Sequence, residues 1–474
     1  MITATAEVAY LMGITQCIMS AQTNRPMMGA VLDTVTGAFL LTSDKSVVTI
    51  DVAHDKVPIG INPATNLVEY ETRDIPMEMM KQPAPVGVQR YVTNEVVHTP
   101  DGLPLMQELN IRPELFYDCL SYITSRDQLA DLNERLDKYN VPHFSGRALF
   151  SALLPSDFYY KKSGKIGDDN NTVIIMNGVL VQGIITKDHI GGSHNSIIQV
   201  LWKDYRGDRT VEFMTDLPFI IDHWLVERGF SVGLQDCYPM DDTHKDMLRT
   251  EIAKTKINVE ALGGKLDDPL EEERREKKIV GLVNNVKDIG YVISTQKLAP
   301  GNALNVMALS GAKGTTFNIA QITGLLGQQF FKGKRIKKQL AGGTRAMPYF
   351  EEGDEDITAR GFIEHSFLEG LSPAEFYAHH IAGREGLMDT ALKTAETGFI
   401  QRKMMETLRD ISVQYDGSVR NTNGNIFQFA YGYDGFDAAE LQMVHTSTGN
   451  IASFIDLAAS ADKINVKYGF APAN

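Results

Sequence analysis

The sequence predicts an α+β protein of several domains, and three features of its 474 residues carry this prediction. β-branched residues dominate residues 171–203, which is typical of strands. Two long helical patterns with a polar tip between them predict an αα-hairpin that ends near residue 296. A third pattern starts at Ser372 and predicts one helix that is much longer than the helices of most globular domains.

The strand-rich region contains the clearest turn signal in the sequence. Asn177 and Gly178 follow an apolar run, and Asn-Gly between apolar runs is typical of a two-residue β-hairpin. We therefore expect strands on both sides of this pair, with the strand pattern continuing to residue 203. Upstream, residues 129–140 have the periodicity of a short amphipathic helix.

The two arms of the expected helical hairpin are separated by residues 263–269, GGKLDDP. Asp268 can cap the second arm, and Pro269 suits its first helical position. Apolar residues recur along one face of this arm, and we expect that face to be buried: Ile279, Leu282, Val283, Val286 and Ile293.

The long helix has a complete start signal. Ser372 can cap it, Pro373 suits the first helical position, and Glu375 completes a capping box. No proline occurs over the next ~38 residues, which as a helix would span about 55–60 Å.

The centre of this helix lacks the bulky residues that a packing face needs. Small residues form a strip at helical spacing, and cations follow it: Ala391, Thr394, Ala395 and Gly398, then Arg402, Lys403 and Arg409. The glycines Gly383, Gly386 and Gly398 each cost a helix about 1 kcal/mol relative to alanine. Spacing alone leaves two interpretations open. Either another helix packs closely on the strip, or the flat face of a base pair lies on it with the cations near phosphates.

Composition restricts the class of protein. No apolar run is long enough to span a membrane, and the N-terminus lacks the pattern of a secretory signal. The three cysteines are far apart, which argues against zinc ribbons and disulfide frameworks. A net charge of −14 argues against binding to free nucleic acid. Basic residues nevertheless gather in 331–345, and the acidic run EEGDED follows at 351–356. The basic run fits either a basic lining or a solvated loop of mixed charge, and we expect EEGDED to be a solvated loop.

Residues 383–403, GREGLMDTALKTAETGFIQRK, resemble the bridge helix of the largest subunit of multisubunit DNA-dependent RNA polymerases. The resemblance is to the eukaryotic, archaeal and large-DNA-virus branch of that family. It continues in order along almost the whole chain, in SAQTNRPMMGAVLDTVTG (20–37), RGFSVGLQD (228–236), LSGAKGTTFNIAQITGLLGQQFFKGKRI (309–336) and VQYDGSVRNTNGNIFQFAYGYDGFDAAEL (413–441).

The resemblance implies five segments in this chain. They are the remainder of an active-site domain at 1–45, a β-rich pore domain at 46–236, a funnel domain with its helical hairpin at 237–371, the bridge helix at 372–411 and the start of a cleft domain at 412–474. The family's metal-binding signature NADFDGD is absent, as are its trigger loop and jaw. We therefore expect a middle slice of a larger subunit with no catalytic residue of its own.

The resemblance also implies roles for individual residues. Thr394 and Ala395 would support the template base, and Phe399, where the family usually has tyrosine, would pack against the template. Arg402 and Lys403 would face the nucleic-acid backbone, and Lys313 would lie near the incoming triphosphate. A seat for the mobile trigger loop would be formed by Ala320, Gln321, Gln328, Gln329, His379 and Glu385.

The implied partners are template DNA, product RNA, nucleoside triphosphates, the remaining pieces of the largest subunit, the second-largest subunit and smaller polymerase subunits. The implied cofactor is Mg²⁺ held by a partner chain, with no zinc site and no membrane contact. We expect an intracellular location, in the nucleus or the cytoplasm, with a viral factory or virion as further settings.

Two functions remain open. The chain is either a working part of an RNA polymerase or a product without activity, such as a truncated or split-gene fragment or a module that docks on a polymerase. GAKGTT does not have the spacing of a phosphate-binding P-loop. His365, His379 and His380 lack carboxylate or cysteine neighbours at ligand spacing, so we expect no metal there. DGSVRNTNGN lacks the last glutamate of a calcium loop and is expected to form a hairpin turn.

Overall fold

The structure is a computed structural model that describes residues 2–43, 45–47, 49–61, 68–75, 89–96, 106–108, 111–124, 129–167, 169–239, 243–264, 266, 268–296, 298–299, 301–446 and 449–468. The chain divides into two compact units. The first unit contains 1–38, 160–172 and 185–474, and the second contains 39–159 and 173–184. The described elements mix helices with small sheets, so the predicted α+β class is confirmed.

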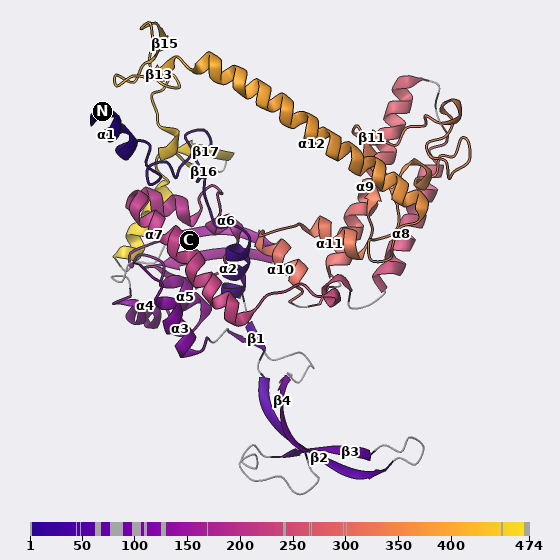
Figure 1. The fold of residues 1–474 in the computed structure, drawn as a ribbon, viewed down its shortest axis with the longest axis horizontal. Coiled ribbons are helices and arrows are strands. Elements are labelled where there is room, and N and C mark those ends of the chain that lie inside the picture. The colour runs from indigo at the N-terminus through magenta and orange to yellow at the C-terminus, as the bar shows by residue number, and fades with distance from the viewer. Residues whose placement is uncertain are drawn as a thin grey trace. The chain divides into compact units, whose positions relative to one another are not determined.

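The second unit contains an antiparallel three-stranded sheet in which β2 (Thr49–Ile61) lies between β3 (Val68–Ile75) and β4 (Gln89–Val96) (Figure 1). The register between β2 and β3 shifts between Pro58 and Gly60. Proline cannot donate a ladder hydrogen bond, so an irregularity at this point is expected. A separate short pair joins β1 (Lys45–Val47) to β5 (Met106–Glu108).

Three short helices contribute to the core of the second unit: α3 (Pro113–Leu120), α4 (Leu132–Lys138) and α5 (Gly146–Ser151). The helix predicted for 129–140 is confirmed as α4. Phe150, Leu154 and Phe158 are fully buried. Gly146 is required here, because a Cβ at this position would lie 1.8 Å from the carbonyl oxygen of Leu41.

The predicted Asn-Gly hairpin is confirmed, since β7 (Asp169–Met176) and β8 (Val179–Gln182) pair in antiparallel fashion. Asn177 and Gly178 have φ values of 47° and 69°, the left-handed pair that such a turn needs. The strand prediction for the rest of 171–203 is wrong. That stretch contains α6 (Lys187–Ile190) and the start of α7 (Ile197–Arg228).

The first unit is mainly helical. At the N-terminus of α7, the Ser196 hydroxyl accepts a hydrogen bond from the backbone of Gln199. The helix breaks at Arg206, whose φ is 65°. The next residue, Gly207, lies so close to Thr15 that a Cβ on Gly207 would be 2.1 Å from the carbonyl oxygen of Thr15. β6 (Tyr160–Ile166) and α1 (Ile2–Tyr10) also belong to this unit.

The predicted helical hairpin is confirmed as α8 (Thr243–Glu260) and α9 (Pro269–Gln296). The Asp268 carboxylate accepts a hydrogen bond from the backbone N–H of Leu270, at the start of α9. The two arms share a core with the segment that precedes the long helix, formed by Leu248, Ile252, Val259, Ile279, Val283, Val286, Leu325, Ile357 and Phe362.

The short helix η3 (Leu234–Cys237) lies between α7 and α8. Short elements connect the hairpin to the long helix: α10 (Ala303–Ser310), α11 (Thr316–Thr323), β9 (Gly327–Gln328) paired with β12 (Phe362–Ile363), β10 (Phe330–Phe331) paired with β11 (Lys334–Arg335), η4 (Ala341–Gly343) and η5 (Thr358–Arg360). After the long helix come β13 (Ile411–Val413), β14 (Val419–Asn421), β15 (Ile426–Gln428), η6 (Ala438–Glu440), β16 (Gln442–Thr446), β17 (Gly449–Ser453) and α13 (Leu457–Lys467). The predicted turn in DGSVRNTNGN is confirmed by the antiparallel order β13-β14-β15.

The long helix is α12 (Pro373–Leu408), a single helix of 36 residues drawn without interruption in Figure 1. At 1.5 Å per residue it is about 54 Å long. None of the helices in the described ranges is long and apolar enough to cross a membrane.

Candidate nucleic-acid interface

The start of α12 has the predicted cap. The Ser372 hydroxyl accepts from the backbone of Glu375 at 3.4 Å, and the Glu375 carboxylate accepts from the backbone of Ser372 at 2.9 Å. The same carboxylate accepts hydrogen bonds from the backbone N–H of Glu364 at 3.0 Å and from Nδ1 of His365 at 2.9 Å. One buried glutamate therefore fixes both the first turn of α12 and the end of β12.

This pairing changes two pKa values. The hydrogen bond to Glu375 raises the pKa of His365 above its ordinary value. Burial alone would raise the pKa of Glu375, but hydrogen bonds from His365 and Ser372 outweigh it and lower that pKa. Both shifts favour the charged pair.

The first turns of α12 pack against the chain segment that follows β11. Ala378 is buried against Ile336 and Met347, and Ile381 is partly buried on the same cluster. Further along, both carboxylate oxygens of Glu385 accept from the backbone N–H of Lys332, at 2.7 and 2.8 Å. These contacts anchor the part of α12 that precedes Gly386.

The predicted trigger-loop seat is mostly brought together around β9 and these first turns. His379 donates from Nδ1 to the side-chain oxygen of Gln329 at 3.2 Å. Burial, and secondarily the neighbouring His380, lower the pKa of His379, which favours the neutral ring. The Gln328 amide donates to the carbonyl oxygens of Gln329 and Arg360, both at 2.9 Å.

The other two predicted seat residues lie on α11. Ala320 is fully buried, so its role in this chain is packing. Gln321 is half-buried, and its backbone oxygen accepts from the N–H of Phe367 at 3.0 Å. Lys313 is exposed in the turn after α10, between Gly311 and Gly314, whose φ values are 77° and 74°.

The centre of α12 is uncovered within the described chain. Every residue from Gly386 to Asp410 is exposed, including the predicted strip of Ala391, Thr394, Ala395 and Gly398. The Thr394 hydroxyl donates to the carbonyl oxygen of Thr390 at 2.7 Å, one turn earlier. Its proton is therefore used inside the helix, but its lone pairs remain free to accept from a ligand.

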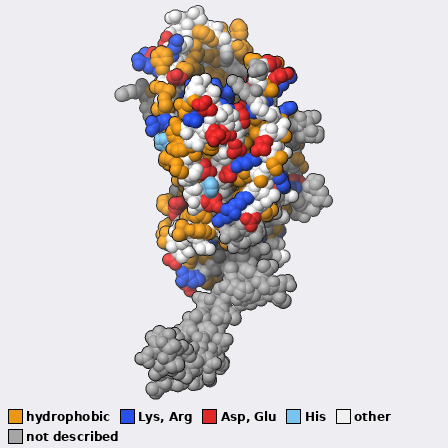
Figure 2. Space-filling view, turned by 90° about the vertical axis from the view of Figure 1, so that its right-hand side faces the viewer, with side chains coloured by type: hydrophobic (Ala, Val, Ile, Leu, Met, Phe, Trp, Pro, Cys, Tyr) orange, Lys and Arg blue, Asp and Glu red, His pale blue; other side chains and the backbone are white. Residues whose placement is uncertain are grey.

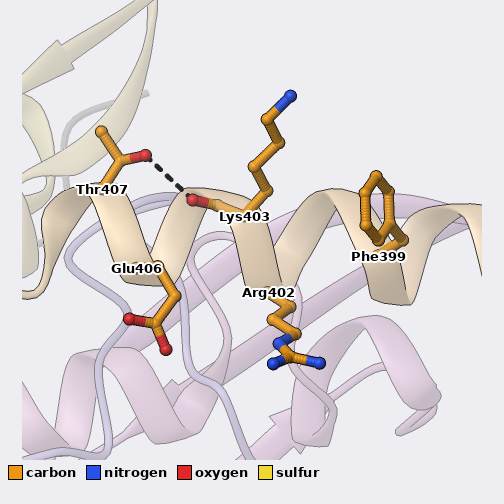
Figure 3. A pocket seen from close by; sticks show the side chains of 5 residues that line it. All are labelled: Phe399, Arg402, Lys403, Glu406 and Thr407. Carbon is orange, nitrogen blue, oxygen red and sulfur yellow. Dashed lines mark hydrogen bonds between the residues drawn. The ribbon is translucent and has the colours of Figure 1, made fainter.

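A shallow open hollow of about 410 Å³ lies beyond the strip and is lined by Phe399, Arg402, Lys403, Glu406 and Thr407 (Figure 3). Figure 3 shows that Lys403 and Arg402 point to opposite sides of the helix, with Glu406 on the Arg402 side. The Phe399 ring is 68% exposed. Two cations beside an exposed ring suit contacts with phosphates and bases.

The expected basic lining at 331–345 is only partly present. Arg335 is fully buried, and its guanidinium donates to both carboxylate oxygens of Glu276 on α9, each at 2.9 Å. Lys338 pairs with Glu355, which also accepts from Arg275 at 3.3 Å. Two of these cations therefore hold the fold together. Glu355 belongs to EEGDED, so the solvated-loop interpretation of that run is wrong at this position.

Charge is not segregated on the surface that Figure 2 shows, where acidic and basic side chains lie interspersed. Among the described residues, no group of three or more His, Cys, Asp or Glu side chains could hold a metal ion. Sequence reasoning missed the contact of Glu385 with Lys332. It is made to a backbone N–H group, so residue type at position 332 gives no signal of it.

Three family models match the chain in order. They are RNA polymerase Rpb1, domain 3, over residues 17–237, domain 4 over 257–363 and domain 5 over 370–469. Among curated relatives, the chain is 30% identical over 462 residues to a probable DNA-directed RNA polymerase II subunit RPB1 homolog of Invertebrate iridescent virus 6, covering 93% of the chain and 39% of that protein. It is 29% identical over 447 residues to the DNA-directed RNA polymerase III subunit RPC1 of Saccharomyces cerevisiae, covering 93% of the chain and 28% of that protein. It thus spans well under half the length of either relative.

Proposed function

Since this chain belongs to the family of largest subunits of DNA-directed RNA polymerases, we propose that it takes part in template-directed RNA synthesis within an assembled polymerase. The observation that carries the proposal is the uncovered centre of α12, where a strip of small residues is followed by an exposed ring and two cations. The proposed partners are template DNA, product RNA, nucleoside triphosphates and the other polymerase subunits.

In this proposal α12 acts as a bridge helix on which the template base pair lies. Ala395 has only a methyl group and Gly398 has no side chain, so a flat base pair can approach the helix closely. Phe399 packs against the template, and Arg402 and Lys403 contact the backbone phosphates. Arg402 can bind a phosphate with two parallel hydrogen bonds, whereas Lys403 acts as a compact charge.

The second proposed element is the seat beside the first turns of α12. The buried amides of Gln328 and Gln329 are held by backbone groups, so the surface above them has a fixed support. We assign this surface to a mobile loop that closes over the incoming nucleotide. Lys313 is exposed in the glycine-flanked turn, and its ammonium can offset charge on a triphosphate.

Bound Mg²⁺ would activate the attacking hydroxyl and stabilise the leaving pyrophosphate. The described residues hold no matching cluster of ligands, so we assign the metal to another chain of the complex. The contribution of this chain is to position the template, the nucleotide and the closing loop.

The test begins with purification of the tagged chain from its native source, together with everything bound to it. Template-directed RNA extension by that complex is the expected result. A substitution of Ala395 by leucine adds bulk to the exposed strip, and we expect extension to be lost. The matched control is Thr397→Leu, at a position about 200° from Ala395 around the helix. If both variants extend RNA equally well, no base pair lies on the strip.

A further inference from the structure

The first turns of α7 contact chain segments that are far apart in the sequence, and one side chain contacts two of them. Gln199 is 3% exposed. Its amide nitrogen donates to the carbonyl oxygen of Asn24 at 3.0 Å and to that of Leu441 at 3.3 Å. Its amide oxygen accepts from the backbone N–H of Asn195 at 2.7 Å. Both amide protons and the oxygen are thus used, each on a backbone group.

The segment at Asn24 is a tight turn. The backbone N–H of Asn24 donates to the carbonyl oxygen of Ser20 at 3.1 Å, and the N–H of Ser20 donates to the carbonyl oxygen of Arg25 at 3.0 Å. Asn24 has a φ of 43°, which is a turn conformation that asparagine tolerates better than most residues. The bond from Gln199 fixes this turn on α7.

The segment at Leu441 follows α12 in the chain and leads into β16. Asn195, Gln199 and Lys203 are spaced four residues apart, so they lie along one side of α7 and the turn before it. Asn195 donates to the carbonyl oxygen of Met443 at 2.5 Å, and Lys203 donates to that of Phe454. The same row therefore holds the chain on both sides of the β16–β17 hairpin.

This row matters because every residue of α12 beyond Glu385 is exposed in the described chain. Its first turns are held directly, whereas within the described residues its far end is held through the segments that follow it. We propose that Gln199 is a positioning residue that ties the turn 20–25 and the segment 441–443 to α7, and through the latter anchors the far end of α12. The second half of this proposal rests on the function proposed above for α12.

The experiment uses the assembled polymerase and measures hydrogen exchange and elongation in the same preparations. Gln199→Leu keeps similar bulk and removes all three hydrogen bonds. We expect amide exchange in peptides covering 19–27 and 440–446 to rise about tenfold, the effect of losing one or two buried hydrogen bonds. We also expect a several-fold lower maximal elongation rate with an unchanged nucleotide concentration for half-maximal rate, since the nucleotide site itself is intact.

Two further variants separate this role from a general loss of folding. Asn195→Gly removes only the bond to Met443, and glycine accepts the φ of 52° at this position. It should raise exchange in 440–446 and leave 19–27 unchanged. Asn302→Ala is the matched control, because this buried amide bonds instead to the carbonyl oxygen of Asp236 at 2.8 Å. It should leave both peptides unchanged.

Two results would overturn the proposal. Unchanged exchange in either peptide of the Gln199→Leu variant would show that Gln199 does not hold that segment. Increased exchange with normal elongation would show that the tie exists but does not anchor α12. A failure of the proposed function looks different, since the unaltered complex would then extend no RNA, while the exchange measurements would still decide whether the tie exists.

Discussion

The carboxylate of Glu385 on α12 accepts the backbone N–H of Lys332 with both oxygens, at 2.7 and 2.8 Å. Lys332 is at the turn between β10 and β11 and has a φ of 52°, which is uncommon for a residue other than glycine. The contact marks the end of the anchored part of α12, because every residue from Gly386 to Asp410 is exposed. Glu385 therefore connects the β10–β11 turn to the last anchored turn of α12.

Removal of this acceptor should loosen the β10–β11 turn. In the assembled polymerase, we expect Glu385→Ala to increase amide exchange in residues 330–335 and to reduce elongation several-fold. The cost in stability should be small, about 1 kcal/mol, because the group is partly exposed. Glu396→Ala is the matched control, since it removes an exposed carboxylate from the same helix. Equal effects of the two variants would mean that the loss of helix charge, and not the contact with Lys332, is responsible.

The pair of His365 and Glu375 predicts a pH dependence at the start of α12. The folded-state pKa of His365 lies above its ordinary value of 6.5, so its stabilising contribution is complete below pH 6.5 and is lost as pH rises through the folded pKa. The folded-state pKa of Glu375 lies below its ordinary value of 4.5, so its contribution is present above pH 4.5 and is lost as pH falls through the lowered value. The pair is therefore most stabilising between about pH 4.5 and 6.5.

Hydrogen exchange of residues 364–378 between pH 5.5 and 8.5, corrected for intrinsic rates, measures this effect. Protection should fall towards the alkaline end in the unaltered protein and should be independent of pH in His365→Gln. The change should be modest, because the His365 side chain is 52% exposed and solvent screens the pair. A variant that keeps the full pH dependence would assign it to another group.

The two cations beside Phe399 predict a salt effect on nucleic-acid binding. We consider Arg402→Ala and Lys403→Ala as two single variants. If each cation contacts one phosphate, each variant should reduce the slope of log affinity against log salt concentration by about one. The measurement is template–primer binding by the complex at several salt concentrations. Lys393→Ala is the control for Arg402→Ala, because its ammonium pairs with Asp389 and lies about 180° from Arg402 around the helix. If the control variant reduces the slope equally, the salt effect comes from the overall charge of the helix and not from a phosphate contact.

Local sequence signals predicted the elements whose ends are built from neighbouring residues. Ser372, Pro373 and Glu375 form a capping box with a proline inside it, and Asn177 with Gly178 forms the hairpin turn. Such features depend on a few adjacent side chains and their own backbone, so tertiary packing rarely changes them. They also predicted α9, because its buried residues recur at helical spacing.

Tertiary packing determines the structure of the regions that the sequence did not predict. Ile197 and Ile198 favour strands by type, yet they are buried in the first turn of α7, where packing outweighs strand propensity. Arg335 lies in a basic run that resembles a solvated surface, but Glu276 binds it from a helix 59 residues away in sequence. The candidate site likewise combines a feature of local sequence with contacts between distant segments. The strip on α12 is visible in the sequence, whereas its anchors at Lys332 and Gln199 are contacts between distant segments.

Gly398 gives the sharpest test of the strip. Apart from the adjoining turns of α12 itself, a Cβ at this position would have no atom of the described residues within 4 Å, so alanine fits without a clash. Alanine also favours the helix by about 1 kcal/mol relative to glycine. On stability alone, Gly398→Ala should therefore be neutral or stabilising. We nevertheless expect slower elongation, because the added methyl group and the stiffer helix oppose the close approach of a base pair and the bending of α12.

The control is Gly386→Ala, which is equally free of neighbours and lies twelve residues earlier, outside the strip. Elongation rates and pause durations of the two variants, measured on one template, separate the two causes. A defect at Gly398 alone assigns the effect to the base pair on the strip. Equal defects at both positions would assign it to bending of the helix as a whole. Normal elongation in both would contradict the bridge-helix role, because a helix that carries a base pair and moves with it cannot accept both changes without a cost in rate.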